Sequence, residues 1–179
     1  MSLNISIVQK DNPVLRQVAR KVPLTEIKTE KIQTIIKQMS QALATQDDGV
    51  AIAAPQIGVP LRIFVVSKKV QVYNRGNEEI SAEELNKLKD DVYINPEITR
   101  LSRQKLHLDE GCLSVRYLYG KVWRSEKASL IAYDENGRKI KKGASGLLAQ
   151  IFQHETDHLN GILFIDKADN IINQPPNEK

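Results

Sequence analysis

The feature that most constrains this chain is the pattern His154-Glu155-x-x-His158, because on a helix it can present two histidines to one metal ion. Residues four apart lie on one face of an α-helix, so both imidazole rings can point toward one ion. The neighbouring residues favour a helix over 145–159, and Gly161 is a typical helix stop. Glu155 can then act on a metal-bound water as general base and afterwards as general acid.

A third metal ligand is needed, and two known arrangements do not supply it. In one class of zinc proteases the pattern continues to a glycine and a third histidine, but Phe164 stands in the final position here. A second class uses a carboxylate from a later helix, whereas Asp166 and Asp169 lie too near the end of the first helix. His107 alternates with apolar neighbours in KLHLDE, as a structural strand residue does.

Cys112, in the sequence DEGCLSV, is the remaining soft ligand. A thiolate with two imidazoles would leave a fourth position open for water, which is typical of catalytic sites rather than structural ones. A lone cysteine is more often a small buried apolar residue. From the residues alone, both interpretations of Cys112 stay open.

The same helix predicts one wall of a pocket. Leu147 and Ile151 form a single stripe with His154 and His158, so the two aliphatic side chains should lie beside the metal. An unbranched thioether such as methionine would suit a wall of this kind.

Composition restricts the class of protein and its partners. The chain has 179 residues, 41% of them apolar and 27% charged, which suits one domain, 1–179, with a substantial core. Its single cysteine excludes an intrachain disulfide and favours a reducing, cytoplasmic compartment. No apolar run is long enough to cross a membrane, and no secretory signal is evident. Because the net charge is only +4 and the basic residues are scattered, we expect no specific nucleic-acid partner.

Hydrophobic periodicity predicts an α+β fold. Apolar residues recur at three- and four-residue spacing over 30–43, which indicates the buried face of a second helix. Strand-like runs cover residues 62–66, 92–98 and 128–134, and Asn136-Gly137 after the last run is a favoured hairpin pair. Short strands mixed with two separated helices favour mainly antiparallel sheets packed against the later helix.

Two segments are expected to lie outside this core. Residues 68–91 are polar and charged and are interpreted as an insertion loop, either a flap over the substrate or a surface excursion. Within the segment, Ser81 and Glu84 have the spacing of a capping box, which predicts a short exposed helix. Residues 167–179 are expected to form a flexible tail.

Three motifs, in this order along the chain, resemble the signatures of the peptide deformylase family. They are GVAIAAPQIG at residues 49–58, EGCLSV at residues 110–115 and QHETDHLNG at residues 153–161. The resemblance extends from about residue 12 to 166. It implies sheets around a central metal-binding helix, and hydrolysis of the N-formyl group from formylmethionine on newly made polypeptides, with release of formate.

The resemblance also implies the roles of individual residues. The metal ligands would be Cys112, His154 and His158, and Glu155 would be the catalytic acid and base. The formyl oxygen would be held by the Gln56 side chain and the Leu113 backbone N–H. The substrate-binding residues would be Gly49, Val50, Ala51, Glu110 and Gly111, together with Leu147 and Ile151.

Cofactor, partners and compartment follow from the same resemblance. The family holds one divalent metal ion, usually Fe(II), although Zn, Ni or Co can occupy the site. The implied partners are nascent chains that begin with N-formylmethionine, with a transient ribosome contact as a further expectation. The compartment would be a bacterial-type cytoplasm or an organelle, because formylated initiation occurs in both.

The sequence departs from the family pattern near the expected substrate path. Ala51 replaces a glycine of the first motif, Arg116 stands where proline or an acidic residue is common, and Trp123 precedes Arg124. Two other functions therefore stay open. One is a metallopeptidase that needs no cysteine ligand, and the other is a peptide-binding module whose groove is reshaped by Ala51 and Arg116.

Overall fold

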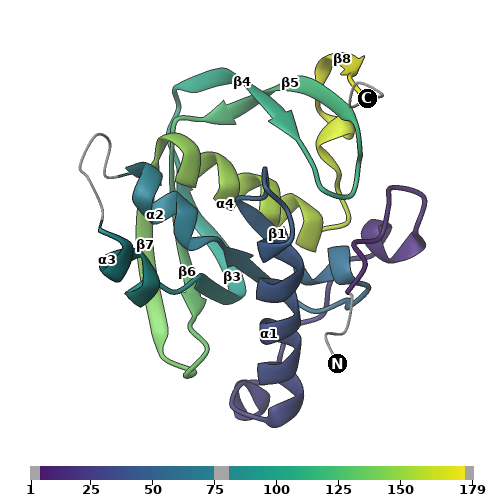
Figure 1. Ribbon diagram of the computed structural model, residues 1–179. Coiled ribbons are helices and arrows are strands. Elements are labelled where there is room, and N and C mark those ends of the chain that lie inside the picture. The colour runs from purple at the N-terminus through teal and green to yellow at the C-terminus, as the bar shows by residue number, and fades with distance from the viewer. Residues whose placement is uncertain (1–4, 75–80, 176–179) are drawn as a thin grey trace.

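The computed structural model describes residues 5–74 and 81–175. Two antiparallel sheets lie on either side of helix α4 (Gly146–Leu159), as Figure 1 shows. This arrangement confirms the predicted α+β fold with its helix between mainly antiparallel sheets.

The larger sheet has five strands in the order β1-β2-β3-β6-β7. Its strands are β1 (Ala51–Ala53), β2 (Ile63–Val66), β3 (Asp91–Leu101), β6 (Lys127–Tyr133) and β7 (Lys139–Ser145). Three buried aromatic rings join this sheet to α4: Tyr93 lies 4.7 Å from Phe64 and 5.3 Å from Phe152, measured between ring centroids. These contacts hold one side of the helix against the core.

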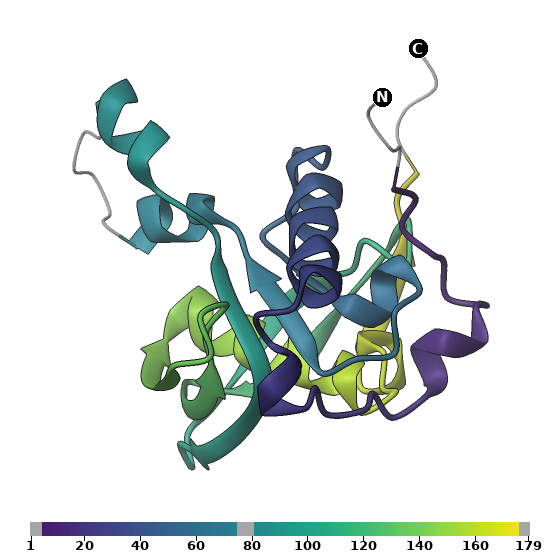
Figure 2. The ribbon, with the colours of Figure 1, turned by 90° about the horizontal axis from the view of Figure 1, so that it is seen from below.

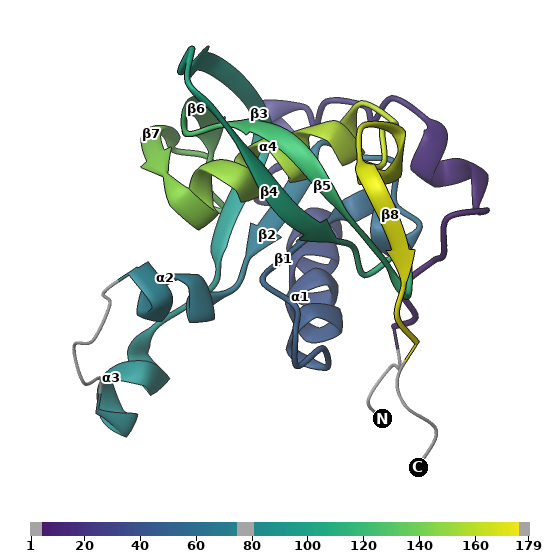
Figure 3. The same cartoon turned by 90° about the horizontal axis from the view of Figure 1, so that it is seen from above.

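The smaller sheet has the order β4-β5-β8 and covers the other side of α4 (Figure 3). Its strands are β4 (Lys105–Gly111), β5 (Leu118–Ser125) and β8 (Asp169–Asn173). Val122 of β5 packs with Leu15, Leu163 and Phe164 in a separate buried cluster. The connection from β4 to β5 carries Cys112, so the sheet delivers this residue to the helix.

Helix α1 (Glu30–Ala44) confirms the second predicted helix, and it stands beside the five-stranded sheet in Figure 2. The predicted apolar stripe is buried; its members are Ile32, Ile35, Ile36, Met39 and Leu43. The described residues also form short 3-10 helices: η1 (Pro13–Arg16), η2 (Leu24–Glu26), η3 (Ala54–Ile57) and η4 (Phe164–Asp166).

Helix α4 ends as the sequence predicts. Gly161 has a φ of +74°, and a Cβ there would lie 2.7 Å from the backbone oxygen of Arg16. Both the left-handed conformation and the close approach require glycine. This stop also sets where the chain turns back toward β8.

The predicted hairpin joins β6 and β7, but its loop is longer than a two-residue turn. Tyr133 pairs with Lys139, so residues 134–138 form the loop. Among these residues Gly137 has a positive φ, whereas a two-residue type I′ turn would require a positive φ at Asn136 as well. Asp134 Oδ1 instead accepts from the backbone N–H groups of Asn136 and Arg138 and closes the loop.

The described parts of 68–91 contain two short helices, α2 (Lys68–Asn74) and α3 (Ala82–Lys87). The capping box of α3 is confirmed, because Ser81 Oγ accepts from Glu84 N and Glu84 Oε2 accepts from Ser81 N. Helix α2 was not expected, and Val70 from it is buried in the core. Figures 2 and 3 both show α2 and α3 at one side of the molecule, away from β4-β5-β8. Residues 75–80 lie outside the described residues, and the choice between a flap and a surface excursion stays a prediction.

The described part of the expected tail, 167–175, contains a strand, whereas residues 176–179 lie outside the described residues. Residues 169–173 form β8, in which Asn173 pairs with Leu118 and Ile172 with Tyr119 of β5. Backbone pairing orders this exposed strand, and periodicity could not reveal it because none of its side chains is buried. Within the described residues, no helix is both long and apolar enough to cross a membrane.

Candidate active site

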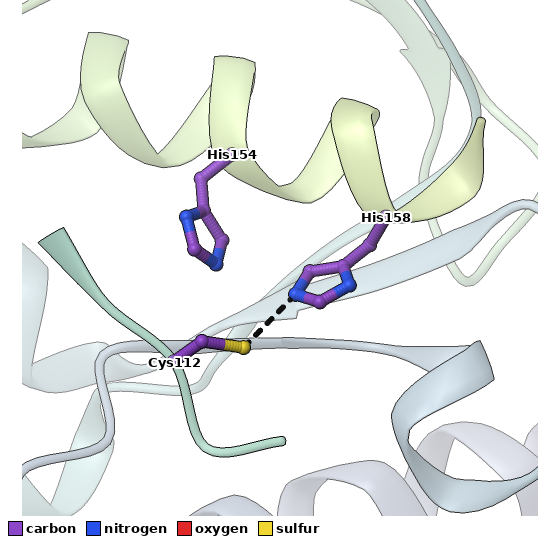
Figure 4. A group of neighbouring side chains, drawn as sticks. All are labelled: Cys112, His154 and His158. Carbon is purple, nitrogen blue, oxygen red and sulfur yellow. Dashed lines mark hydrogen bonds between the residues drawn. The ribbon is translucent and has the colours of Figure 1, made fainter. Parts of the chain in front are cut away.

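The structure brings Cys112, His154 and His158 together (Figure 4). One ligand atom from each residue lies within 4.8 Å of the other two, and Cys112 Sγ is 3.2 Å from His158 Nε2. The two histidines are one turn apart on α4, and the cysteine follows β4 directly. One sulfur and two nitrogen atoms fit a divalent transition metal, with a coordination position left open.

Glu110 controls the direction of His154. His154 Nδ1 lies 2.9 Å from Glu110 Oε2, which leaves Nε2 to face the metal position. Such hydrogen bonds fix the tautomer and the ring orientation of a metal-binding histidine. Arg124 also donates to both carboxylate oxygens of Glu110. A substrate can therefore contact Glu110 only as part of the cavity wall and not through a free carboxylate oxygen.

A buried chain of charges lies behind Glu110. Arg124 Nε donates to Glu110 Oε1 at 2.7 Å and Nη2 donates to Oε2 at 2.9 Å, while Nη1 donates to Asp157 Oδ2 at 2.6 Å. Lys167 Nζ donates to both Asp157 oxygens at 2.7 and 2.8 Å. The chain therefore runs from His154 through two acidic residues and Arg124 to a lysine at the protein surface.

In this row of charged residues, the hydrogen bonds together shift the pKa values more than burial does. Burial alone would raise the pKa of Glu110, but the hydrogen bonds from Arg124 and His154 lower it to about 2. Burial would likewise lower the pKa of Arg124, whereas its bonds to Glu110 and Asp157 raise it. Both groups are therefore ionised at neutral pH, as a buried pair with complete hydrogen bonding requires.

Glu155 is in a different environment from Glu110. Its side chain is buried next to His154, and its Oε2 atom has no hydrogen-bond partner among the described residues. Burial raises the pKa of this carboxyl to about 7. A carboxyl with a pKa near the working pH is suited to taking up and releasing a proton.

Gln56 and Leu113 lie next to the ligands, as expected. Gln56 is buried in η3, directly after β1, and its Oε1 accepts from Ala53 N at 2.8 Å. Its Nε2 donates to Ser114 Oγ at 3.2 Å and lies 3.6 Å from Cys112 Sγ. The amide group is thus held with its N–H donors toward Ser114 and the Cys112 sulfur.

The site opens into a cavity of about 310 Å³. Twelve of the thirteen predicted site residues line it: Gly49, Val50, Ala51, Gln56, Glu110, Gly111, Cys112, Leu113, Leu147, Ile151, His154 and Glu155. His158 lies deeper and does not line the cavity. The predicted aliphatic wall of Leu147 and Ile151 is therefore next to the metal position.

The departures from the family pattern have separate structural outcomes. Ala51 has a negative φ, so its methyl group causes no backbone strain. Trp123 is exposed, stacks on His107 at 4.6 Å between ring centroids, and does not line the cavity. This contact supports the structural interpretation of His107. Arg116 does line the cavity.

Sequence reasoning did not assign the residues that support the site. Arg124 was named only as the residue after Trp123, and Asp157 was given no role. The available signal was the charge of Asp157. This residue lies among buried residues of α4, and a buried carboxylate needs a cationic partner such as an arginine. The Gln153 side chain was also missed; it accepts from Ser125 N and donates to Ser125 O, which attaches α4 to β5.

The fold and the site define an α+β protein of the H-E-x-x-H class, in which a cysteine lies where it could serve as a third metal ligand. The family model described as polypeptide deformylase matches residues 5–174. The chain belongs to the polypeptide deformylase family.

Several relatives show the extent of the similarity. Peptide deformylase 1A of Arabidopsis thaliana is 42% identical over 90% of this chain, and the match spans 60% of the plant protein. The peptide deformylase of Carboxydothermus hydrogenoformans is 39% identical over 93% of this chain and 94% of its own length. A Synechococcus elongatus peptide deformylase, solved with actinonin, is 35% identical, with a TM-score of 0.76 over 95% of this chain and 82% of its own. An Acinetobacter baumannii enzyme with bound Met-Ala-Ser is 28% identical, with a TM-score of 0.78 over 93% of this chain and 99% of its own.

Proposed function

We propose that this protein hydrolyses the N-formyl group from polypeptides that begin with N-formylmethionine and releases formate. The observation that carries this proposal is the position of Glu155 beside the Cys112, His154 and His158 group, in a cavity lined by the family motifs. The bound Met-Ala-Ser in the Acinetobacter baumannii relative supports a substrate of this kind.

A divalent metal ion would be held by Cys112, His154 and His158, and we propose Fe(II) as the physiological ion, with Zn, Ni or Co as substitutes. The bound ion would act as a Lewis acid and lower the pKa of a water molecule. Glu110 would keep the His154 ring oriented toward the ion.

The protein residues would divide the reaction between them. Glu155 would accept the proton of the attacking water at its carboxylate and pass it to the amine nitrogen as the formyl C–N bond breaks. The Gln56 Nε2 and the Leu113 backbone N–H would donate to the formyl oxygen as negative charge develops on it. The Gln56 amide is fixed by its bonds to Ala53 and Ser114, and Leu113 directly follows Cys112, which favours preorganised stabilisation of that charge.

The cavity would position the substrate by its methionine. The methionine side chain would pack against Leu147 and Ile151, and the peptide backbone would run between Gly49–Ala51 on one side and Gly111 on the other. The free backbone N–H and C=O groups of an extended peptide need partners along such a groove.

Formate release by the protein, purified without oxygen and loaded with Fe(II), tests this function. Formyl-Met-Ala-Ser should yield formate and intact Met-Ala-Ser, measured by mass spectrometry. The Glu155→Gln variant keeps the shape of the side chain but cannot shuttle the proton, so turnover should fall by about 10² to 10⁴-fold. A metal-filled protein that binds the peptide without releasing formate would instead indicate a binding module.

The metallopeptidase alternative has its own test. Cys112→Ser should lower the metal content if the thiolate is a ligand, because a hydroxyl binds soft metals poorly. Unchanged metal content, together with cleavage inside the peptide, would favour a peptidase.

Relatives named from bacteria and from plant organelles suit either compartment, and we propose that the protein acts where translation begins with formylmethionine. A transient contact with the ribosome stays a prediction.

A further inference from the structure

The charged side chains at the mouth of the cavity are arranged in ion pairs. Arg116 Nη1 donates to Asp48 Oδ2 at 2.7 Å, and Nη2 donates to Asp48 Oδ1 at 3.2 Å. Nη2 also donates to Gln46 Oε1 at 2.7 Å. Arg116 and Asp48 both line the cavity, and their two-point contact holds the guanidinium in a defined position.

This ion pair connects the two sides of the cavity. Asp48 directly precedes the Gly49–Ala51 wall, and Arg116 follows Cys112 by four residues on the opposite side. Lys69 of α2 donates to the backbone oxygens of Gln46 and Asp47, each at 3.3 Å. The turn that carries Asp48 is therefore anchored independently of Arg116.

A second ion pair neutralises the remaining charge at the mouth. Asp109 lines the cavity from β4, and Lys121 Nζ of β5 lies 3.1 Å from its carboxylate. The other charged residues of the lining lie deeper: Glu110 is buried against Arg124, and Glu155 is beside the metal ligands. Within the described lining, each acidic or basic side chain at the mouth thus has a partner of opposite charge.

We propose that the Arg116–Asp48 pair determines substrate range: it keeps the mouth electrically neutral where the residues after methionine pass. This inference rests on the proposed deformylase function. An enzyme that acts on the start of newly made chains meets acidic and basic residues at these positions. A single fixed charge at the mouth would favour one kind over the other, whereas a closed pair favours neither.

The two members of the pair act oppositely when separated. Asp48 without Arg116 leaves a negative charge that attracts basic substrates, and Arg116 without Asp48 leaves a positive charge that attracts acidic ones. The hydrogen bond with Arg116 lowers the pKa of Asp48, so both groups are charged at neutral pH. When Asp48 is replaced, the Gln46 contact still holds Arg116, and when Arg116 is replaced, the Lys69 anchor still holds the turn that carries Asp48.

Two peptides of opposite charge test the inference: the C-terminal amides of formyl-Met-Ala-Glu-Ser and formyl-Met-Ala-Lys-Ser. The measured quantity is the ratio of kcat/KM for the glutamate peptide to that for the lysine peptide. In the unaltered protein this ratio should lie within about twofold of one. Asp48→Asn should raise the ratio about threefold or more, and Arg116→Gln should lower it by a similar factor, as expected for one exposed charge pair.

Two further variants separate electrostatics from shape. The double variant Asp48→Asn/Arg116→Gln has lost both charges, so its ratio should return to the unaltered value. Glu83→Gln breaks the exposed Glu83–Lys87 pair on α3, away from the cavity, and should leave the ratio unchanged. High salt should remove the effects of the single variants, because about 1 M salt screens charges beyond about 3 Å.

The results distinguish this inference from the proposed function. No formate from either peptide with the unaltered, Fe(II)-loaded protein would overturn the function itself. Normal turnover with equal ratios in all variants would overturn only the role of the ion pair. A shift of both single variants in the same direction would also overturn it, because that result would indicate a change of groove shape.

Discussion

Two arginines of this protein each bind a carboxylate through two hydrogen bonds, but in opposite environments. The Arg124 side chain is 4% exposed and lies between Glu110 and Asp157, behind the metal ligands. The Arg116 side chain is 25% exposed and pairs at the mouth of the cavity with Asp48, whose side chain is 57% exposed. The two ion pairs therefore have similar contacts and very different solvation.

Solvation decides what each pair can do. When a buried partner is removed, the other charge stays in an environment without water, so the whole site depends on Arg124. At the surface, water replaces a lost partner and the fold changes little. A surface pair can consequently be adjusted for substrate range, whereas a buried pair belongs to the architecture that orients His154.

The sharpest test of this contrast is the replacement of each arginine by methionine. Arg124→Met leaves Glu110 buried without its cation and should lower the free energy of unfolding by about 3–5 kcal/mol. Arg116→Met should lower it by less than about 1 kcal/mol. Urea unfolding of the metal-free proteins measures both values. Equal losses would show that burial does not distinguish the two pairs.

Metal affinity should separate the same two regions. Glu110→Gln keeps an oxygen near His154 but loses the charge that holds the ring and Arg124, so affinity should fall by about 10 to 100-fold. Asp48→Asn, which makes the same chemical change at the surface pair, should leave the affinity unaltered. Competition with a chelator for Co(II), followed by visible absorption, measures both variants. If both lost metal equally, the Glu110 contact would have no special role.

The sequence predicted the residues of the metal site better than the residues that support them. The reason is that most of the site residues are close together along the sequence. His154, Glu155 and His158 lie on one helical turn, so their geometry follows from helix periodicity alone. Cys112 could only be assigned through the resemblance, because its approach to α4 depends on how β4 and β5 pack over the helix. A contact between distant segments leaves no periodic signal.

The same distinction explains the remaining differences in the fold. Helix α1 was predicted because its buried face repeats along the sequence, whereas β8 was missed because its side chains are exposed and its pairing with β5 uses the backbone. Arg124 and Asp157 are 33 residues apart, and their contact became evident only in three dimensions. Charged residues within otherwise apolar segments were the one available indication.

Lys167 provides an intermediate case between the two arginines. Its side chain is 40% exposed, and it binds the largely buried Asp157, which Arg124 also binds. Lys167→Met should therefore lower the free energy of unfolding by only about 1 kcal/mol, because Arg124 remains as a charged partner. Metal affinity should change by less than about threefold. A loss of metal affinity as large as that in Glu110→Gln would mean that Lys167, at the surface end of this row of charges, also orients His154.

The smallest expected effect concerns the pH dependence of the surface pair. The hydrogen bond from Arg116 is the main cause that lowers the pKa of Asp48 below its ordinary value of 3.8. A carboxyl whose pKa is lowered by folding stabilises the protein above its ordinary pKa, and this contribution disappears as the pH falls through the lowered value. The difference in unfolding free energy between the unaltered protein and Arg116→Gln should therefore be constant from about pH 7 to 5 and shrink below about pH 4. Urea unfolding across this range measures the difference. A difference that grows toward acid would show that Arg116 stabilises the fold through contacts other than the Asp48 carboxylate, and the two arginines would then differ less than their solvation indicates.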